Sequence, residues 1–352
     1  MSAIKNKLMV YGANGYSAQL IIEELIQRGI KPILAGRNSE AIKNVAAKYL
    51  CDYRVFDLNY DNESKNSLED IHTLINCAGP FKYTAKDMID YCLASKTNYL
   101  DITGEIPVFA YAYGCNNRAK ENGIVILPGV GFDIIPTDCL AKRLSELMPD
   151  AIHLKLAFMN RKGGISRGTT LTSLEFISGN GKIRRNGKII DSPIGEFTVE
   201  IKHPFYSMYG ISIPWGDVFT AYISTGIPNA EVYMGLTKLL FSVRKILITL
   251  LKIYKIPFIK KISARYVSKK FTGPDKETRD NTETFIWGRV ENKKGDNIEQ
   301  VYQVMEGYNL TAKGAAEAAI RVLNNELKPG FYTPSLAFGS KFLELFVKEK
   351  II

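Results

Sequence analysis

Residues 8–18 read Leu-Met-Val-Tyr-Gly-Ala-Asn-Gly-Tyr-Ser-Ala, and this stretch decides the fold of the first part of the chain. A short apolar run ends at Gly12, and Gly15 and Ala18 follow at three-residue spacing. A helical pattern of apolar residues then continues to Gly29. The glycines permit a tight turn and a close backbone approach, and the alanine lets the helix pack on the strand. This order of strand, turn and helix is typical of a segment that binds the pyrophosphate of a dinucleotide.

The end of the next apolar run indicates which dinucleotide is preferred. The run over residues 31–37 ends at Arg37, about twenty residues beyond the glycine motif, where an acidic residue would hold the ribose 2′-hydroxyl of NAD. A guanidinium suits a 2′-phosphate, so Arg37 favours NADP(H) over NAD(H). Asp57 ends the run over 52–58 and is placed to accept a hydrogen bond from the adenine amino group. The alternatives are a solvated strand end for Arg37 and a helix cap or turn for Asp57.

Composition narrows the class of protein. A chain of 352 residues that is 46% hydrophobic is long enough for two domains, each with a core. The five cysteines, at positions 51, 77, 92, 115 and 139, include no Cys-x-x-Cys pair, which is typical of reduced thiols in a cytosolic protein. The three histidines lack the spacing of metal ligands, so we expect no metal site. The first residues lead directly into a strand, and we expect no targeting segment.

Strand-like runs alternate with helical patterns through about residue 148. The expected strands after the first are 31–37, 52–58, 72–79, 98–102 and 123–127. The expected helices after the first are 39–49, 63–69, 84–95 and 107–122. This alternation predicts an α/β Rossmann domain with a doubly wound parallel sheet over residues 1–148.

The pattern changes near Ala151 and predicts a second domain. Strand-like segments dominate residues 149–308, so we expect an α+β domain with a largely antiparallel sheet, for substrate binding or dimerisation. The expected strands are 153–158, 182–190 with a turn at Asn186-Gly187, 197–203, 283–290 and 298–305, and one helix is expected over 169–177. The C-terminal segment 309–352 begins with a helix over 310–324 that is expected to return to the first domain.

Small and polar residues follow three of the expected strands, at 76–81, 101–105 and 128–133. Ligands of doubly wound sheets bind beyond these carboxyl ends, although each segment alone is also compatible with an ordinary turn. The residues predicted to bind the cofactor are Gly12, Asn14, Gly15, Tyr16, Ser17, Arg37, Asp57, Cys77, Ala78, Gly79, Pro80, Asp101, Thr103 and Gly104.

Hydride transfer also needs a proton donor, and no Tyr-x-x-x-Lys signature supplies one. The candidate catalytic residues are Tyr99, Asp101, Asp133 and His203. Ser166, Arg167 and Thr169 form a polar entry to the expected helix at 169–177 and are predicted to hold an anionic group of the substrate. Helix capping is the alternative role for these three residues.

Together these motifs resemble the saccharopine dehydrogenase-like oxidoreductase family. The matching segments are 12–17, 34–37, 77–81, 99–105, 128–133, 166–172, 271–274, 287–288 and 332–334. The chain is most similar to the trans-acting enoyl reductase-like and membrane-associated members. The resemblance implies an NAD(P)-binding Rossmann domain, a second α+β domain and hydride transfer, and it leaves the substrate open. Ser17-Ala18 stands where the family usually has Thr-Gly, which keeps the hydroxyl and a small residue.

The net charge of +10 comes from one segment. Residues 232–274 contain ten basic and no acidic residues, and the rest of the chain carries equal numbers of each. The charge therefore does not indicate a nucleic-acid-binding surface.

Within the basic segment 236–270, residues 238–255 form an amphipathic helical pattern. Its longest uncharged run, Ile246 to Leu251, is far shorter than the roughly 20 residues that span a bilayer. Phe241 and Ile248 fall on the basic side of the helix, which favours an interfacial helix that contacts an anionic membrane through Lys238–Lys270. The alternatives are packing of the apolar side on the core, and an oligomer interface such as a homodimer.

The sequence therefore predicts an NADP(H)-dependent oxidoreductase acting on a hydrophobic, lipid-like or acyl small molecule. We expect it to be cytoplasmic and peripheral on the cytoplasmic face of the membrane. One alternative is saccharopine-type reductive amination, although few arginines are available for a substrate with several carboxylates. Another is a non-catalytic NADP-binding protein that uses its basic helix as a membrane or partner adaptor.

Overall fold

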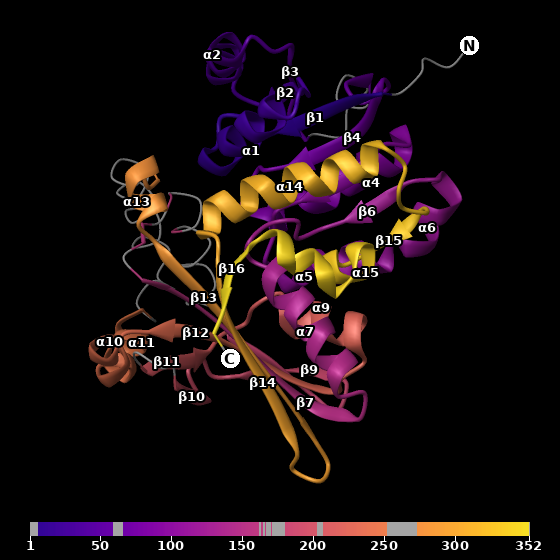
Figure 1. The fold of residues 1–352 in the computed structure, drawn as a ribbon. Helices are drawn as coiled ribbons and strands as arrows, with labels where there is room; N and C mark the ends of the chain where they lie inside the picture. The colour runs from indigo at the N-terminus through magenta and orange to yellow at the C-terminus, as the bar shows by residue number, and fades with distance from the viewer. Residues whose placement is uncertain are drawn as a thin grey trace. The chain divides into compact units, whose positions relative to one another are not determined.

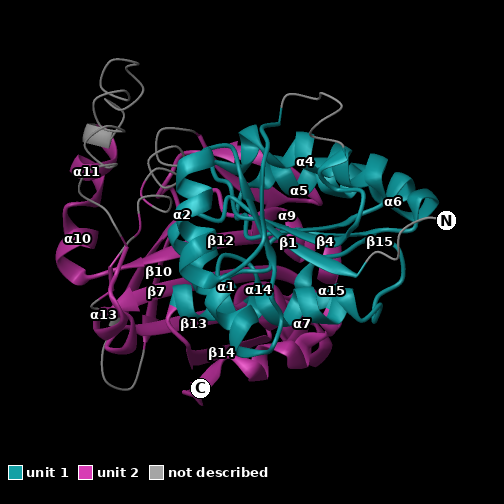
Figure 2. Ribbon diagram, turned by 90° about the horizontal axis from the view of Figure 1, so that it is seen from above, with its two compact units in different colours: residues 1–135, 307–337 teal, residues 136–306, 338–352 magenta. Residues whose placement is uncertain are grey.

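A computed structural model describes residues 6–58, 66–161, 163, 164, 166, 170, 180–202, 207–251 and 273–351. The chain forms two compact units, residues 1–135 with 307–337 and residues 136–306 with 338–352 (Figure 2). The sequence had predicted a boundary at residue 148 and a separate C-terminal segment from 309. The units instead divide after Ile135, and the C-terminal segment is shared between them. The expected helix at 169–177 lies outside the described residues, as does the start of the expected helix at 63–69.

Unit 1 is built on a parallel sheet of seven strands in the order β15-β6-β5-β4-β1-β2-β3 (Figure 1). The strands are β1 (Lys7–Tyr11), β2 (Ile33–Gly36), β3 (Tyr53–Val55), β4 (Ile71–Asn76), β5 (Asn98–Asp101), β6 (Val125–Leu127) and β15 (Gly330–Phe331). Val10 is paired with Leu34 on one side and with Ile75 on the other. Chain order reverses between β1 and β4, which is the point at which doubly wound sheets bind their ligands. The predicted Rossmann sheet is confirmed, with β15 as an additional strand.

Local sequence explains where some helices of unit 1 begin and end. They are α1 (Tyr16–Gln27), α2 (Ser39–Tyr49), α4 (Ala85–Ser95), α5 (Ile106–Gly114), α6 (Asn116–Asn122), α14 (Gly307–Leu323) and α15 (Pro334–Phe338), with a short 3-10 helix η1 (Phe81–Tyr83). The Asn38 side chain caps α2 by accepting a hydrogen bond from Ala41 N at 3.0 Å. The helix expected over 107–122 is two helices, because the backbone at Cys115 leaves helical geometry.

The last long helix, α14, belongs to unit 1, as the sequence predicted. It lies beside α1, and Arg28 at the end of α1 pairs with Glu317 of α14 at 2.6 Å. Its buried residues are mostly alanine, glycine and threonine. Such small side chains let two helices approach closely, so residues about 300 positions apart in sequence build one face of the first unit.

Unit 2 contains a mixed sheet of nine strands. They are β7 (Ala151–Arg161), β8 (Gly181–Arg185), β9 (Lys188–Ser192), β10 (Thr198–Lys202), β11 (Ser207–Ser212), β12 (Asn229–Leu236), β13 (Glu283–Asn292), β14 (Asn297–Val304) and β16 (Val347–Lys350). All pairings are antiparallel except that of β7 with β12. Asn186 and Gly187 have φ of 49° and 77° and form the predicted hairpin turn between β8 and β9.

The sequence did not predict β11, β12, β16 or the helices of unit 2, apart from the expected helix at 169–177 and the helical pattern at 238–255. Those described are α7 (Ile135–Leu147), α9 (Asp217–Thr225), α10 (Lys238–Ser242), α11 (Arg244–Leu251), α13 (Lys276–Asp280) and the 3-10 helix η3 (Ser340–Leu345). The helix α7 explains why the units divide before residue 148. Its Leu140 and Leu144 pack onto β13 at Gly288, where a Cβ would lie 2.7 Å from Leu144 Cδ1. On the opposite face Trp287 is buried among Met159, Tyr233 and Val301.

Gly288→Ala should lower the free energy of unfolding of unit 2 by about 1–3 kcal/mol, because the added methyl overpacks the contact between α7 and β13. Gly114→Ala is the matched control, since no atom lies within 4 Å of a Cβ there and alanine favours helix. Urea unfolding followed by circular dichroism measures both variants. Equal midpoints for the two variants would contradict this account of the α7 contact.

Candidate functional site

The glycine turn after β1 is held between the ends of β2 and β4. Gly12 has φ of +78°, and a Cβ there would lie 2.8 Å from Ala78 N. The amides of Gly12 and Ala13 donate to Ala35 O at 2.8 and 3.1 Å, and Gly15 N donates to Gly12 O at 2.9 Å. Glycine at position 12 is therefore required for two reasons, the positive φ of the backbone and the close approach of the chain at the end of β4.

The helix α1 presents its first turn without a side-chain cap. Gly15 is its N-cap residue, and no acidic residue occupies the first turn. Asn14 is exposed, Tyr16 and Ser17 are partly exposed, and Ala18 is buried beneath them. The first amides of this helix are the donors that a phosphate group requires, and the helix dipole favours negative charge there.

Arg37 and Asp57 are both exposed, directly after β2 and just beyond β3. Both act electrostatically on the Tyr11 hydroxyl, which donates to Phe56 O at 3.2 Å. Burial raises the pKa of Tyr11 to about 12, Asp57 adds to this rise and Arg37 opposes it. A cation and an acid thus flank the same edge of the sheet, as the sequence predicted, and no acid occupies the position of Arg37.

The chain after β4 folds around the Asn76 side chain. Asn76 Oδ1 accepts from Ala78 N at 3.0 Å, and the Thr84 hydroxyl donates to Ala78 O at 2.6 Å. Cys77 N donates to Tyr11 O at 2.8 Å. Burial raises the pKa of the Cys77 thiol well above its usual range, with the Asp101 charge adding to the rise, so this cysteine is held as a neutral thiol. The predicted residues Cys77, Ala78, Gly79 and Pro80 therefore form a fixed loop beside the glycine turn.

A buried carboxyl organises the ends of β5 and β6. Asp101 is fully buried, and its Oδ2 accepts from the Tyr99 hydroxyl at 2.7 Å. Its Oδ1 accepts from Thr103 N at 3.0 Å and Gly129 N at 2.9 Å. Burial raises the pKa of Asp101 to about 6, while these hydrogen bonds oppose the rise. Tyr99 is equally buried, and burial followed by the Asp101 charge raises its pKa well above the usual value.

Two further acids lie at this edge. Glu105 is nearly buried, and its carboxylate accepts from Phe81 N at 2.8 Å and Lys82 N at 2.9 Å, which ties the β4 loop to the β5 loop. Asp133 is partly exposed and lies against Gly104, where a Cβ would be 2.9 Å from Asp133 Oδ2. Burial and then the Glu105 charge raise the pKa of Asp133 to about 7.

The helix α14 supports this loop from a distant part of the sequence. Thr311 Oγ1 accepts from Phe132 N at 3.0 Å and donates to Gly307 O at 2.8 Å. A Cβ on Gly131 would lie 3.1 Å from Thr311 Cγ2. The loop that carries Asp133 is therefore fixed on both sides.

The structure brings most of the predicted residues together, and it buries some of them. All the predicted cofactor residues lie at the carboxyl edge of the parallel sheet in unit 1. Among the catalytic candidates, Tyr99 and Asp101 are buried, and the Tyr99 hydroxyl donates to Asp101. Asp133 is partly exposed, and His203 lies outside the described residues.

The predicted substrate triad is only partly described. Ser166 is buried, its carbonyl accepts from Thr170 N at 2.9 Å, and Arg167 and Thr169 lie outside the described residues. The sequence did not assign Asn76, Glu105 or Thr311 to the site. An acid directly before the Ile106-Pro107 helix start was the available signal for Glu105. Nothing in the sequence spacing connects Thr311 with Phe132.

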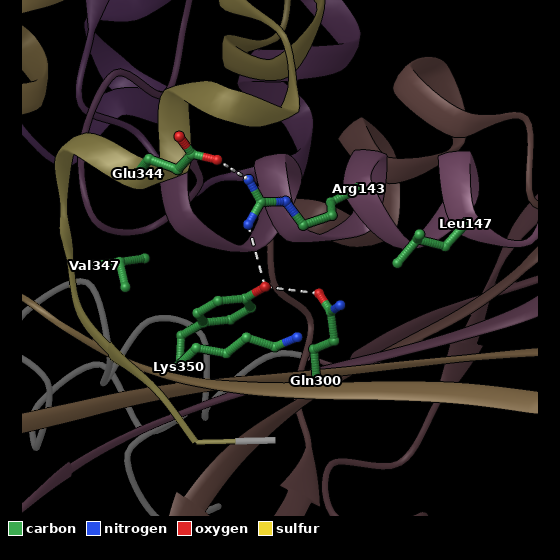
Figure 3. Close-up of a pocket in the computed structure, with 7 residues that line it drawn as sticks. Arg143, Leu147, Gln300, Glu344, Val347 and Lys350 are labelled. Carbon is green, nitrogen blue, oxygen red and sulfur yellow. Dashed lines mark hydrogen bonds and ion pairs between the residues drawn. The ribbon is translucent and has the colours of Figure 1, made fainter.

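A hollow lies wholly within unit 2. It measures about 480 Å³ and is lined by Arg143, Leu147, Gln300, Tyr302, Glu344, Val347 and Lys350 (Figure 3). Arg143 donates to Glu344 at 2.8 Å and to the Tyr302 hydroxyl at 3.2 Å, and that hydroxyl donates to Gln300 at 2.8 Å. Arg143, Glu344, Tyr302 and Gln300 thus form one chain of hydrogen bonds that connects α7 to β14 and η3, which gives this hollow a structural role.

Two features of the described residues bear on other predictions. No group of three or more histidine, cysteine, aspartate or glutamate side chains among them is arranged to hold a metal ion. In the same part of the chain, no helix combines the length and the apolar character that crossing a bilayer requires.

Comparisons with known proteins agree with this fold. The saccharopine dehydrogenase-like oxidoreductase of Bos taurus is 28% identical over an alignment of 151 positions, which covers 37% of this chain and 35% of the relative. The trans-acting enoyl reductase of Mycobacterium leprae is 28% identical over 139 residues, 37% of this chain and 33% of the relative. The matches thus cover about a third of those relatives. No protein-family model matches the chain.

Among solved structures, the apo saccharopine dehydrogenase (L-Glu forming) of Saccharomyces cerevisiae superposes with a TM-score of 0.66 at 12% identity, covering 99% of this chain and all of that one. This likeness confirms the predicted fold, a Rossmann sheet with a second α+β part. The relatives confirm the resemblance to saccharopine dehydrogenase-like oxidoreductases.

The Asp101 network gives a pH-dependent stability. Because the folded-state pKa of about 6 exceeds the ordinary value of 3.8, the folded protein binds the proton more tightly and loses stability as pH rises from 4 to 7. Asp101→Asn cannot titrate, so its free energy of unfolding relative to the native chain should improve by about 2–3 kcal/mol over this range. Denaturant unfolding at pH 4, 5.5 and 7 measures this, and a constant difference between the two proteins would contradict the raised pKa.

Proposed function

We propose that this chain is an NADP(H)-dependent oxidoreductase that passes a hydride to or from a lipid-like or acyl substrate at a membrane surface. The observation that carries the proposal is the uncapped start of α1 behind Gly12, with the exposed Arg37 at the neighbouring strand end. Backbone amides in this geometry suit a pyrophosphate, and the guanidinium suits an adenosine 2′-phosphate. The cofactor would supply the hydride chemistry, and the protein would supply binding, orientation and a proton.

The fixed loops after β4, β5 and β6 would hold the nicotinamide end. Ala78 and Gly79 are small and leave room for a flat ring close to the backbone. The loop positions depend on Asp101 and Glu105, which bind backbone amides and are nearly or fully buried. We assign these two acids as positioning residues for the cofactor site.

Asp133 is the best candidate for the proton donor. It is a partly exposed carboxyl at this edge, and its pKa of about 7 leaves part of the population protonated at neutral pH. General acid catalysis is most effective when the pKa of the donor lies near the working pH. Tyr99 and Asp101 lack the exposure that this role needs.

Two observations favour a lipid-like or acyl substrate. One relative is named as a trans-acting enoyl reductase, and reduction of an unsaturated acyl carbon needs one hydride and one proton. The alternative of reductive amination would need arginines free to bind several carboxylates. The described candidates are engaged elsewhere, since Arg161 pairs with Glu283 at 2.9 Å, Arg185 pairs with Glu231, and Arg184 donates to Val218 O at 2.9 Å. The adaptor alternative predicts NADPH binding with no turnover on any substrate class.

Asp133→Asn should reduce NADPH oxidation with enoyl-thioester substrates by about 10²–10⁴-fold with little change in NADPH affinity, because it removes the proton donor. The native rate should fall as pH rises through about 7, where Asp133 loses its proton. Glu105→Gln should move this limb to lower pH, because the Glu105 charge contributes to the raised pKa. Stopped-flow absorbance at about 340 nm, within the absorbance band of NADPH, follows the reaction. Full turnover by Asp133→Asn would exclude this residue as the donor.

Arg37→Gln should weaken NADPH binding by about 10–100-fold and leave NADH binding nearly unchanged, because only the 2′-phosphate loses a charged hydrogen bond. Titration of nicotinamide fluorescence measures both affinities. Arg118→Gln, an exposed arginine on α6 that pairs with Asp90 at 3.0 Å, is the control. Equal weakening of both cofactors would show that Arg37 does not read the 2′ position.

A further inference from the structure

The helices α10 and α11 expose an unusual amount of aliphatic surface. Leu239 is 74% exposed and Ile246 is 64% exposed. Leu240, Val243 and Leu247 are between 37% and 43% exposed. We call these five side chains the apolar ridge. They fall within nine consecutive residues, whereas exposed large apolar residues elsewhere in the described chain are scattered singly or in pairs.

Two other apolar residues attach the helices to unit 2. The Phe241 ring lies 5.1 Å from the Tyr209 ring of β11, and a Cβ on Gly195 would be 2.9 Å from Ile248 Cδ1. Sequence analysis placed Phe241 and Ile248 on the basic side and expected them to meet the membrane. The structure corrects this expectation, because they pack on the protein and the opposite apolar side is exposed. The alternative in which that apolar side packs on the core is also wrong for the described residues.

The charged side chains of α10 and α11 are all positive. Lys238 and Lys245 are exposed, and the Arg244 guanidinium lies 3.9 Å from the centre of the Phe241 ring. No acidic residue occurs from residue 232 to residue 274, so no side chain of this segment can neutralise them. A surface that is aliphatic in the middle and cationic around it is complementary to a partner with an apolar interior and an anionic surface.

We propose that the apolar ridge inserts into the interfacial region of an anionic phospholipid bilayer, while Lys238 and Lys245 contact the headgroups. This deepens the membrane location in the proposed function and does not depend on hydride transfer. Interfacial helices bury their apolar face about 5–10 Å into the headgroup and acyl boundary, a depth that short helices such as α10 and α11 can provide. Phe241 and Ile248 then act as the attachment between the lipid-bound helices and the sheet of unit 2.

A second copy of this chain fits the same surface less well. A two-fold contact would place each apolar ridge against its equivalent and bring the flanking cations of both copies together. The segment has no acid with which to pair them, so such a contact would be opposed by like charges. An anionic bilayer satisfies both the apolar and the charged components.

Flotation of the full chain with vesicles tests the proposal. We expect binding to vesicles of phosphatidylglycerol and phosphatidylcholine, weak binding to phosphatidylcholine alone, and loss of binding at high salt. Leu239→Gln and Ile246→Gln should each lower partitioning by about tenfold, because each removes a side chain that enters the lipid. Leu147→Gln is the matched control, a leucine on α7 that is 53% exposed and outside the apolar ridge. It should change partitioning by less than about twofold.

Each other outcome overturns the proposal. Flotation that the apolar-ridge variants leave unchanged would assign lipid binding to another surface. Absence of flotation, with a dimer in light scattering that Ile246→Gln dissociates, would make a second copy the occupant. NADPH titration of the same variants keeps the two proposals separate. Normal NADPH binding without flotation would refute only the membrane contact, and flotation without NADPH binding would refute only the proposed function.

Discussion

The close approach of Gly12 to the backbone at Ala78 is the constraint on which the carboxyl edge of the parallel sheet depends. The missing side chain lets the turn after β1 rest on the chain that leaves β4, with only 2.8 Å to a Cβ placed at residue 12. Because the same turn is bound to Ala35 O, three strand ends are fixed relative to one another. The start of α1 then lies at the point where strand order reverses, with its amides free of any side-chain cap. A larger residue at position 12 would separate these strand ends and move the amides at the start of α1.

Buried acids fix the other half of the edge. Asp101 and Glu105 together accept four backbone amide hydrogen bonds, which come from the segments that follow β4, β5 and β6. Buried backbone amides need partners, so each carboxylate specifies one arrangement of its loops. The cost is electrostatic, since burial raises the pKa of Asp101 and Asp133 and the Glu105 charge adds a smaller contribution to both. Burial, with the Glu105 charge second, therefore raises the pKa of Asp133 to about 7, which suits the proton-donor role that we propose for it.

The orientation of α10 and α11 shows what the periodicity of apolar residues cannot predict. A helical wheel identifies the apolar side of a helix, and the usual assumption is that this side packs on the protein. Here the attachment uses Phe241 and Ile248, which the wheel places among the lysines, because Tyr209 and Gly195 offer them contacts on unit 2. Which side of an amphipathic helix faces its own protein depends on the surface that it meets, and this surface is built from strands elsewhere in the chain.

The sequence by itself determined the parts of this protein that local pattern controls. Gly12, Gly15 and Ala18 specified the turn, alternating periods specified the parallel sheet, and Asn186-Gly187 specified a hairpin, because each depends on backbone conformation or on neighbours close in the chain. The tertiary structure alone decided that Tyr99 and Asp101 are buried, that Thr311 supports the loop at Phe132, and that the units divide at the first residue of α7. These features depend on contacts between residues that are distant in sequence, and on burial, which sets both the accessibility of a carboxyl and its pKa.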